Sequence, residues 1–466
     1  MIRTGRSSAF IYMSAAPQRI RTAERLDFQG VDEQSLKVMT WPGRTYFLLL
    51  AVFAAILAAG VVTFIYQVYT GIGVSGMGQP VMWAFYVNTF VFWVGIGHSG
   101  TLISAVLYLF RSRWRASIYR CAETMTVFAI SIAGLFPIIH LGRPWFFYWL
   151  FFYPNERVLQ PDFHSPLVWD AFAIGTYLIV SCIFLYIGAI PDLATVASSS
   201  TGIRSKIYRI ISLGWRGDQR QWRHFSTVYL LMAGLATPLV ISVHSVVSFD
   251  FAMAQLPGWH DTIFAPYFVA SAIYSGLGML MMLLPLVRRL GRFEDEITIW
   301  HFDQLGKLAL LMSLIISYSY LSESFMAWYS NDPFERTTFT MRYFGPYAAL
   351  FWMMCWCNAI LPLTLFSKKL RTNLKFVPIM GFFAFIGVWL DHFVIIAGSL
   401  TTNFIPSQWK FYAPTWPELV IEAASLAMFI FLYMLAFKVE PLISMSEIKT
   451  GLSWLDRALQ RIHAKR

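Results

Sequence analysis

The stretch from His140 to Trp145, His-Leu-Gly-Arg-Pro-Trp, closes a long apolar segment, and the next apolar segment opens with Trp169-Asp170. An imidazole, a guanidinium and a carboxylate would therefore meet at one rim of a group of membrane helices. Imidazole titrates near neutral pH, and arginine holds anions with a rigid fork of donors. Such a set can bind the polar head of a hydrophobic molecule and move its protons.

The elements that position these residues are predicted to be membrane helices. Of the 466 residues, 57% are hydrophobic and only 13% are charged, which is too little charge for the surface of a soluble protein. Repeated apolar runs of about 20 residues predict an all-α membrane protein with ten transmembrane helices. The predicted spans are 45–68, 81–110, 121–141, 167–190, 226–249, 263–287, 301–325, 344–366, 376–398 and 418–437.

The basic residues predict how these helices are oriented. Thirty of the 36 Lys and Arg residues lie in the two terminal segments or in the loops after even-numbered spans, and five lie in the other loops. By the positive-inside rule, we expect both termini in the cytoplasm. Contact with anionic lipid headgroups then explains the net charge of +11, so no nucleic-acid partner is needed.

The spacing of the spans predicts two bundles of four helices with one flanking helix at each end. Spans 2, 3 and 4 precede spans 6, 7 and 8 by about 180 residues, an offset that preserves direction and indicates a parallel repeat. Its clearest local similarity is between the six residues from His244 and the six from His392. The expected parts are a cytoplasmic N-terminal arm (1–44), the first span with an outer loop (45–80), a first four-helix bundle with the binding site (81–250), a second four-helix bundle (251–416), and the last span with a cytoplasmic tail (417–466). The arm is either an interfacial or docking segment or a tail without structure.

Five ionisable residues of the first bundle are predicted to share one depth near the outer face. Spans 3 and 5 run outward, and span 4 starts on that side. His244 would lie about 9 Å deeper than Asp250, at the helical rise of 1.5 Å per residue. The residues are His140, Arg143, Asp170, His244 and Asp250, with Trp169 beside them. Aromatic residues are expected at any membrane interface, so Trp169 alone indicates little.

Each of these residues also has a purely structural explanation. Arg143 can extend to headgroups or cap a helix end, and Asp170 can act near a helix N-cap. His140 can bond a carbonyl that is freed near Pro137. Asp250 lies nearest to water. The convergence of two histidines, two aspartates and an arginine is harder to explain by anchoring, because ionisable groups inside a membrane are costly.

A second set of polar residues is predicted to carry protons through the bundles. In span 7, Ser313, Ser317, Tyr320 and Ser324 follow one helix face. The candidate proton path comprises His98, Glu123, Lys307, Ser317, Tyr320, Glu323, Asp391 and His392. The alternative is that these side chains form hydrogen bonds between helices, which Ser and Tyr supply routinely.

The sequence predicts no metal site, haem or iron–sulfur cluster in this chain. The four cysteines, at 121, 182, 355 and 357, do not follow a cluster-binding pattern. Haem is a competitor, since His140 and His244 could meet, but no span carries two histidines a few turns apart. The chain also lacks the Gly-rich Lys-Ser/Thr loop of nucleotide hydrolases, so ATP is not the expected energy source.

The motif from His140 to Trp145 resembles the signature of NrfD/PsrC-type integral membrane subunits. The stretch from Phe163 to Asp170, Phe-His-Ser-Pro-Leu-Val-Trp-Asp, looks most like the ActC component of bacterial alternative complex III. The resemblance covers roughly residues 40–440 and implies a quinol site at the outer end of the first bundle. It implies catalytic roles for His140, Asp170 and Asp250, with the quinol, expected to be menaquinol, bound by His140, Arg143, Asp170, Trp169 and His244.

The resemblance also implies partners and a location. The chain would act as the quinol-oxidising subunit of an oxidoreductase in the bacterial cell (inner) membrane, inactive alone. Electrons would pass to a periplasmic iron–sulfur subunit with [3Fe–4S] or [4Fe–4S] clusters, alongside a paralogous membrane subunit and cytochrome c subunits with haem c. Proton translocation is a further expectation. The alternatives are a proton-coupled transporter or channel without redox chemistry, the membrane subunit of a molybdopterin-type oxidoreductase, and a structural anchor.

Overall fold

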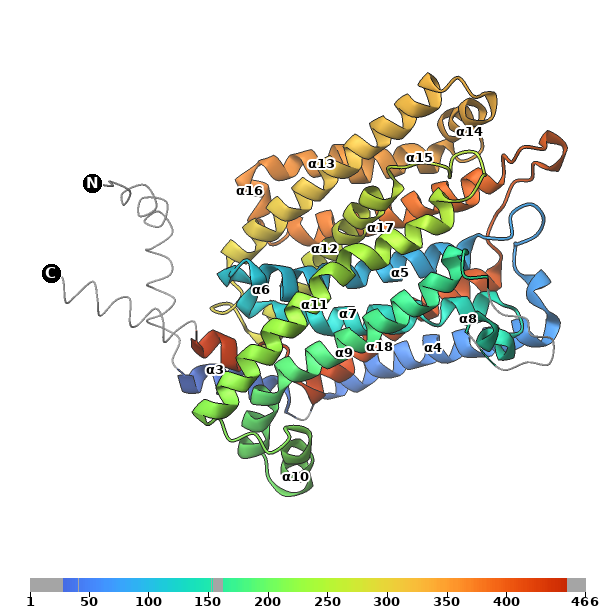
Figure 1. Cartoon of the computed structure of the whole chain (residues 1–466). Helices are drawn as coiled ribbons and strands as arrows, with labels where there is room; N and C mark the ends of the chain where they lie inside the picture. Colours follow the sequence, from blue (N-terminus) through green and yellow to red (C-terminus); the bar gives the residue numbers. More distant parts are fainter. Residues whose placement is uncertain (1–27, 41, 152, 154–161, 451–466) are drawn as a thin grey trace, which may run out of the picture.

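A computed structural model describes residues 28–40, 42–151, 153 and 162–450 of the chain (Figure 1). In these ranges, ten helices are long and apolar enough to cross a membrane, and regular structure is helical apart from one isolated β-bridge. The prediction of an all-α protein with ten spans is therefore confirmed. The spans are α4 (Arg44–Thr70), α5 to α6 (Phe85–Leu109), α7 and α8 (Tyr119–His140), α9 (Pro166–Ser199), α11 (Gln219–Ala252), α12 (Phe264–Gly291), α13 (Ile299–Tyr329), α15 to η6 (Ala348–Phe366), α17 to η7 (Phe376–Gly398) and α18 (Trp416–Val439).

Two spans are less regular than the sequence predicted. The third is divided into α7 (Tyr119–Ala133) and α8 (Phe136–His140), because Pro137 lacks the N–H that a continuous helix needs. The eighth begins later than predicted, since Gly345-Pro346 separates it from a short helix, α14 (Pro333–Phe344). The division of the third span places His140 at the end of its own short helix.

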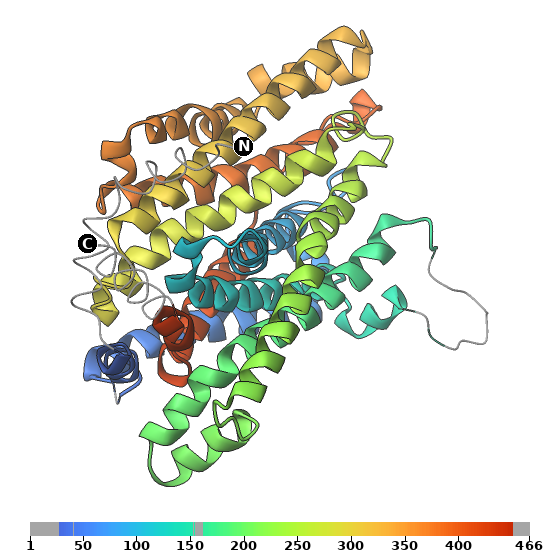
Figure 2. The same ribbon diagram turned by 60° about the vertical axis from the view of Figure 1, so that its left-hand side comes forward.

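The helices pack as two groups that share a central contact (Figures 1 and 2). In the first group α5 contacts α7, α7 contacts α9, α9 contacts α11, and α11 returns to α5. In the second, α12 contacts α13 and α17, and α17 contacts α15. Both α5 and α11 pack on α12, and α4 and α18 form a flanking pair with α18 against α7. Residues from the two groups therefore meet around α5, α11, α12 and α17.

The central position of α5 depends on small residues. A Cβ at Gly100 would collide with the carbonyl oxygen of Ala122 in α7, and a Cβ at Gly276 in α12 would collide with Ser99. Small residues let membrane helices approach closely, so that van der Waals contact and hydrogen bonds can hold them together. The approach brings the polar side chains of α5 into the interior of the protein.

The loops rich in Lys and Arg gather at one end, here called the basic end, and the other end is called the opposite end. At the basic end a short helix, α3 (Phe28–Val38), lies within the predicted N-terminal arm and contacts α12. The Asp32 carboxylate pairs with Lys449 at 2.5 Å, and Gln34 donates to the Arg292 carbonyl. This part of the arm is therefore a docked segment of the fold.

Candidate functional site

Two aspartates from neighbouring helices meet near the opposite end. Asp170 lies in the first turns of α9, which starts at Pro166, and Asp250 lies near the end of α11. Their carboxyl groups are in hydrogen-bonding contact, and Asp170 is only 5% exposed. The Oδ1 atoms of both are buried without a partner in the described part of the chain. Two carboxyl groups can bond to each other only through a shared proton, so the pair is built to hold and exchange one.

His140 ends α8 and does not serve the backbone around Pro137. The Ile139 carbonyl accepts a hydrogen bond from Gln67 Nε2 at 3.3 Å, and Tyr86 holds that amide by donating to Gln67 Oε1 at 2.5 Å. The His140 Nδ1 atom is buried and has no partner among the described residues. Because its Nδ1 atom has no partner there, the imidazole is available to a ligand.

The structure separates the predicted rim residues by exposure. Arg143 is exposed, and its guanidinium makes no ion pair with any acid that the structure describes. The Trp169 indole donates to the Phe163 carbonyl at 2.7 Å, which fixes the loop before α9. Within the described ranges no hydrogen bond joins His140 to either aspartate. His140 and the aspartate pair therefore make no direct hydrogen bond to each other in the described structure.

The second histidine of the predicted site, His244, lies in a row of buried imidazoles. Its ring centre is 4.8 Å from that of His98 in α5 and 6.4 Å from that of His392 in α17. His98 Nδ1 contacts the Val94 carbonyl at 2.6 Å, and the other five ring nitrogens of the row are buried without a described partner. The row joins the two helix groups, whereas the sequence had placed His244 in one set and the other two histidines in another.

Beside this row, Asp391 is the acceptor of three hydroxyl groups. Tyr267 donates to it at 2.5 Å, Tyr320 at 2.9 Å and Ser271 at 3.2 Å. The Asn358 amide in turn donates to Tyr320 at 2.9 Å. Tyr320 and Asp391, two residues of the predicted proton path, are therefore hydrogen-bonded to each other, while Tyr267 and Ser271 were not singled out from the sequence.

A salt bridge continues this cluster toward the opposite end. Glu323 lies 3.5 Å from Arg342 of α14, whose guanidinium also donates to Ser399 and to the Gly258 carbonyl at 2.9 Å each. Both charged side chains are about 5% exposed. Arg342 was missed because the sequence placed it in the loop between spans 7 and 8, where it counted only as a basic loop residue and α14 was not foreseen.

Two other candidates of the proton path have ordinary structural partners. Ser317 donates to the Ser313 carbonyl at 2.8 Å, within its own helix. Lys307 is half exposed and pairs at 2.6 Å with Asp303, which also accepts from Arg371 at 2.9 Å. These contacts match the alternative in which polar side chains stabilise helix packing.

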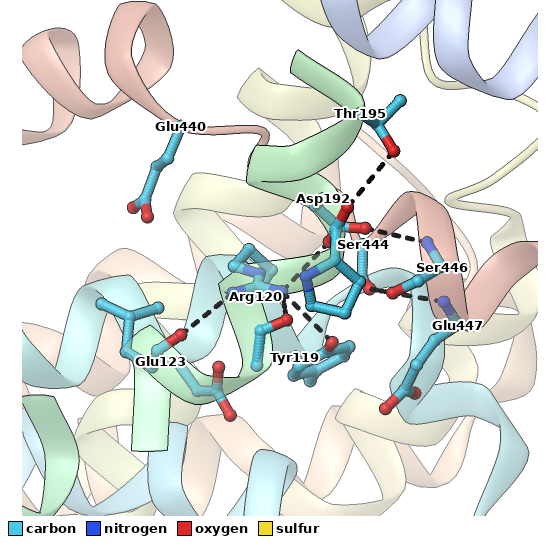
Figure 3. Close-up of polar contacts among 12 residues, drawn as sticks. Tyr119, Arg120, Glu123, Asp192, Thr195, Glu440, Ser444, Ser446 and Glu447 are labelled. Atoms are coloured by element: carbon cyan, nitrogen blue, oxygen red, sulfur yellow. Dashed lines mark hydrogen bonds and ion pairs between the residues drawn. The ribbon is translucent and has the colours of Figure 1, made fainter. Parts of the chain in front are cut away.

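At the basic end, Glu123 belongs to a larger group of charges (Figure 3). It accepts from Tyr229 at 3.1 Å, and its neighbour Arg120 pairs with Asp192 at 3.1 Å. Around them lie Thr124, Glu440, Ser446, Arg115 and Glu447. Burial raises the pKa of Glu440 and Glu447, while nearby arginines act in the opposite direction. The sequence singled out only Glu123, because Arg120 and Asp192 lie just outside the predicted spans 121–141 and 167–190, whereas the structure includes them in α7 and α9.

No metal-binding group is seen in the ranges that the structure describes. Nowhere in them do three His, Cys, Asp or Glu side chains come together as ligands. The chemistry that the residues themselves offer is the binding and transfer of protons.

Comparisons with known proteins identify the family. The family model described as polysulphide reductase, NrfD, matches residues 73–404. The chain belongs to this family. The matched region contains every candidate site residue from His98 to His392, whereas α4 and α18 lie outside it.

Three relatives are similar over part of their length. The chain is 29% identical over 248 residues to the membrane subunit of a putative dimethyl sulfoxide reductase of Halobacterium salinarum, a match that spans 53% of each protein. It is 22% identical to a subunit of the selenate reductase of Mesobacillus selenatarsenatis, covering 66% of this chain and 71% of that protein. It is 21% identical to the Hdr-like menaquinol oxidoreductase integral membrane subunit of Archaeoglobus fulgidus, covering 75% and 78%.

Proposed function

We propose that this NrfD-family chain is the quinol-oxidising membrane subunit of a multisubunit electron-transfer complex. The carboxyl pair of Asp170 and Asp250 carries the proposal, because its buried oxygens lack partners and unsatisfied buried polar atoms are costly. The His140 Nδ1 atom at the same end is unsatisfied as well. A quinol supplies two hydroxyl groups that can meet such atoms. The menaquinol named for the Archaeoglobus relative favours menaquinol as the substrate.

In this proposal the protein holds the quinol and takes its protons. His140 accepts a hydrogen bond from one quinol hydroxyl, and Asp170 accepts the proton of the other. Asp250 receives that proton through the carboxyl contact and releases it toward the opposite end. Arg143 and Trp169 border the entrance. Oxidation of one quinol releases two protons, one to His140 and one to Asp170, and two electrons, which leave to an iron–sulfur partner subunit.

Proton transfer deeper in the protein is a second part of the proposal. The row of His98, His244 and His392 leads from the first helix group to Asp391 and Tyr320 in the second. Imidazoles 4.8 and 6.4 Å apart, centre to centre, can exchange protons directly or through one water. Glu323 and Arg342 extend this route to the opposite end, and Glu123 belongs to a separate group at the basic end.

Two kinds of complex remain as candidates for the assembly. The motif from Phe163 to Asp170 favours the ActC component of alternative complex III, with a paralogous membrane subunit and cytochrome c subunits. The names of the dimethyl sulfoxide and selenate reductase relatives favour the membrane subunit of a molybdopterin-type oxidoreductase. Co-purification separates them, because haem c in the isolated complex supports the first and molybdenum supports the second. In either case we place the basic end in the cytoplasm of a bacterial cell and the quinol site at the periplasmic end of the 81–250 bundle.

The direct test replaces His140 by glutamine or Asp170 by asparagine in the intact complex. We expect quinol oxidation to fall by roughly 10²–10⁴-fold, the usual contribution of a positioned acid or base. Asp162→Asn is the matched control, because Asp162 is 74% exposed in the loop before α9. Normal quinol oxidation by a correctly assembled H140Q or D170N complex would exclude the proposed site.

A further inference from the structure

A cavity of about 500 Å³ opens at the basic end, far from the proposed quinol site. It lies between the end of α9, the loop that joins α10 (Gly202–Ile211) to α11, and the segment that follows α18. Thr195 and Ser446, which line it, also border the charged group of Figure 3. No Asp or Glu lines the cavity.

Three hydrogen-bond donors of this cavity, on Arg216 and two tryptophans, have no side-chain acceptor among the described residues, and a fourth donor, Lys449, is paired with a single acid. Arg216 is exposed and has no acid partner among the described residues, and Lys449 has only Asp32. The Trp215 and Trp222 rings stand at 88° with their centres 5.0 Å apart. Their Nε1 atoms both lie 3.8 Å from the position a Cβ on Gly217 would take. In the described chain neither indole N–H has an acceptor, so two cations and two neutral donors face one space.

The helix before the cavity has the character of an interfacial helix. The exposed residues Ile203, Ile207 and Ile210 follow one face of α10, with exposures of 77%, 49% and 74%. The basic residues of this helix are Arg204, Lys206 and Arg209. A helix with one apolar face and lysines or arginines elsewhere lies in the plane of a membrane surface.

The position of α10 indicates the level of the membrane at which the cavity lies. It packs on α9, where the Tyr186 hydroxyl donates to the Ile211 carbonyl at 2.6 Å. Figure 2 shows α9, α10 and the start of α11 extending away from the other helices. An apolar face left open there is stable only against lipid, because such exposed patches are unfavourable in water. The cavity that follows α10 in the chain therefore lies at the level of the lipid headgroups.

We propose that this cavity binds the phosphate group of an anionic phospholipid from the adjoining leaflet. Arg216 and Lys449 would neutralise the phosphate, and the Trp215 and Trp222 indoles would donate to its oxygens. The acyl chains would extend over the apolar face of α10. Basic pockets between membrane helices on the cytoplasmic side are suited to such headgroups. A free phosphate shares this chemistry, but it would leave the apolar face of α10 uncovered.

The test uses the purified complex in nanodiscs of phosphatidylcholine with a small fraction of phosphatidylglycerol. Lipid retained after detergent washing is measured by native mass spectrometry, for the wild type, R216Q and the W215F/W222F double variant. The phenylalanines keep the rings and remove only the N–H donors. R289Q is the matched control, because Arg289 is another exposed arginine at the basic end. We expect R216Q to weaken phosphatidylglycerol retention by about tenfold, the effect of losing one charge-assisted hydrogen bond.

Five outcomes decide the proposal. Weaker retention in R216Q and in W215F/W222F, with R289Q unchanged and the melting temperatures equal, would support it. Displacement of the lipid by inorganic phosphate at equal concentration would show a free-anion site and overturn it. Equal retention of phosphatidylcholine, or wild-type retention in R216Q, would overturn it too. If the variants unfold, the wild type alone still tests the proposal. Phosphatidylglycerol should raise its melting temperature above that in pure phosphatidylcholine, and no such rise would contradict the proposal.

Discussion

The carboxyl groups of Asp170 and Asp250 lie in hydrogen-bonding contact, although they come from opposite ends of two antiparallel helices, α9 and α11. The contact makes the two residues one functional unit, because a proton on either is shared with the other. A single buried carboxylate in the membrane region would be costly, and the contact gives each of the two a partner.

This relationship predicts non-additive effects of substitution. D170N and D250N should each lower quinol oxidation by roughly 10²–10⁴-fold, and the double variant should be little worse than either, because residues that act as a unit do not contribute independently. The measurement is kcat for oxidation of a soluble menaquinol analogue by the assembled complex. Losses that multiply in the double variant would show that the two carboxyl groups work separately.

The buried histidine row predicts chemical rescue. H244A should slow proton-coupled turnover, because it removes the imidazole between His98 and His392. Added imidazole should restore part of the rate by occupying the space, whereas a merely structural histidine would not respond in this way. V247A, a nearby buried truncation in α11, is the control for the cavity itself. Turnover of the two variants should be measured over a series of imidazole concentrations. If imidazole does not change the rate of H244A, His244 does not belong to the proton path.

Removal of the Tyr320 hydroxyl is predicted to destabilise the protein. Its hydroxyl donates to Asp391 and accepts from Asn358, both at 2.9 Å. Y320F would leave a buried amide donor unsatisfied, and we expect it to lower the free energy of unfolding by about 1–3 kcal/mol. Y318F, on an exposed tyrosine of the same helix, should have no measurable effect. Thermal unfolding of the detergent-solubilised protein provides the comparison, and equal melting temperatures would mean that water replaces the lost hydroxyl.

Most of the fold could be predicted from the sequence, because a membrane requires long apolar helices and each leaves a strong local pattern. The interruption of the third span and the short helices between spans were harder to predict. Pro137 lies inside a continuous apolar run, so hydropathy alone did not show that α8 is separate. In the same way, α14 and α10 are short helices whose apolar and polar residues alternate too closely to stand out from the loops.

The candidate site was predictable in composition but not in its contacts. Ionisable residues within spans were visible, so Asp170, Asp250 and the histidines could be named. Which of them touch depends on helix rotation and tilt, which packing decides. His244 illustrates this, since depth placed it with Asp250 but its side chain turns toward His98. The local similarity around His244 and His392 was the one sequence signal for the row.

Among the substitutions considered, replacement of Arg120 is predicted to cause the largest loss in the free energy of unfolding. It is 1% exposed and bonds Asp192 at 3.1 Å and the Gly188 carbonyl at 2.6 Å (Figure 3). R120M would leave a buried carboxylate without its partner, and we expect a loss of about 3–5 kcal/mol. R289M, on an exposed arginine, is the control. The double variant R120M/D192L should recover part of the loss in thermal unfolding, and a double variant less stable than R120M would show that the pair is not the cause.

Glu296 predicts a pH dependence of stability at the basic end. It lies in the loop between α12 and α13, is 4% exposed, and has a buried Oε2 without a partner among the described residues. Burial, with Asp295 and Glu294 nearby, raises its pKa from 4.5 to about 7. The folded protein therefore binds this proton more tightly than the unfolded chain does. The contribution of Glu296 to the free energy of unfolding is greatest below about pH 4.5, falls as the pH rises, and levels off above about pH 7. Its total change is at most about 3 kcal/mol.

The variant E296Q should remove this dependence. Above pH 7 we expect it to be more stable than the wild type, because the wild type must bury a charge there, and near pH 4.5 the two should be alike. E294Q removes the same charge from an exposed neighbour, and because Glu294 makes the smallest contribution to the raised pKa of Glu296, this variant should shift the profile only slightly. Melting temperatures of the solubilised protein from pH 4.5 to 8.5 give the comparison. A wild-type profile that E296Q does not alter would mean that water reaches this carboxylate in the folded protein.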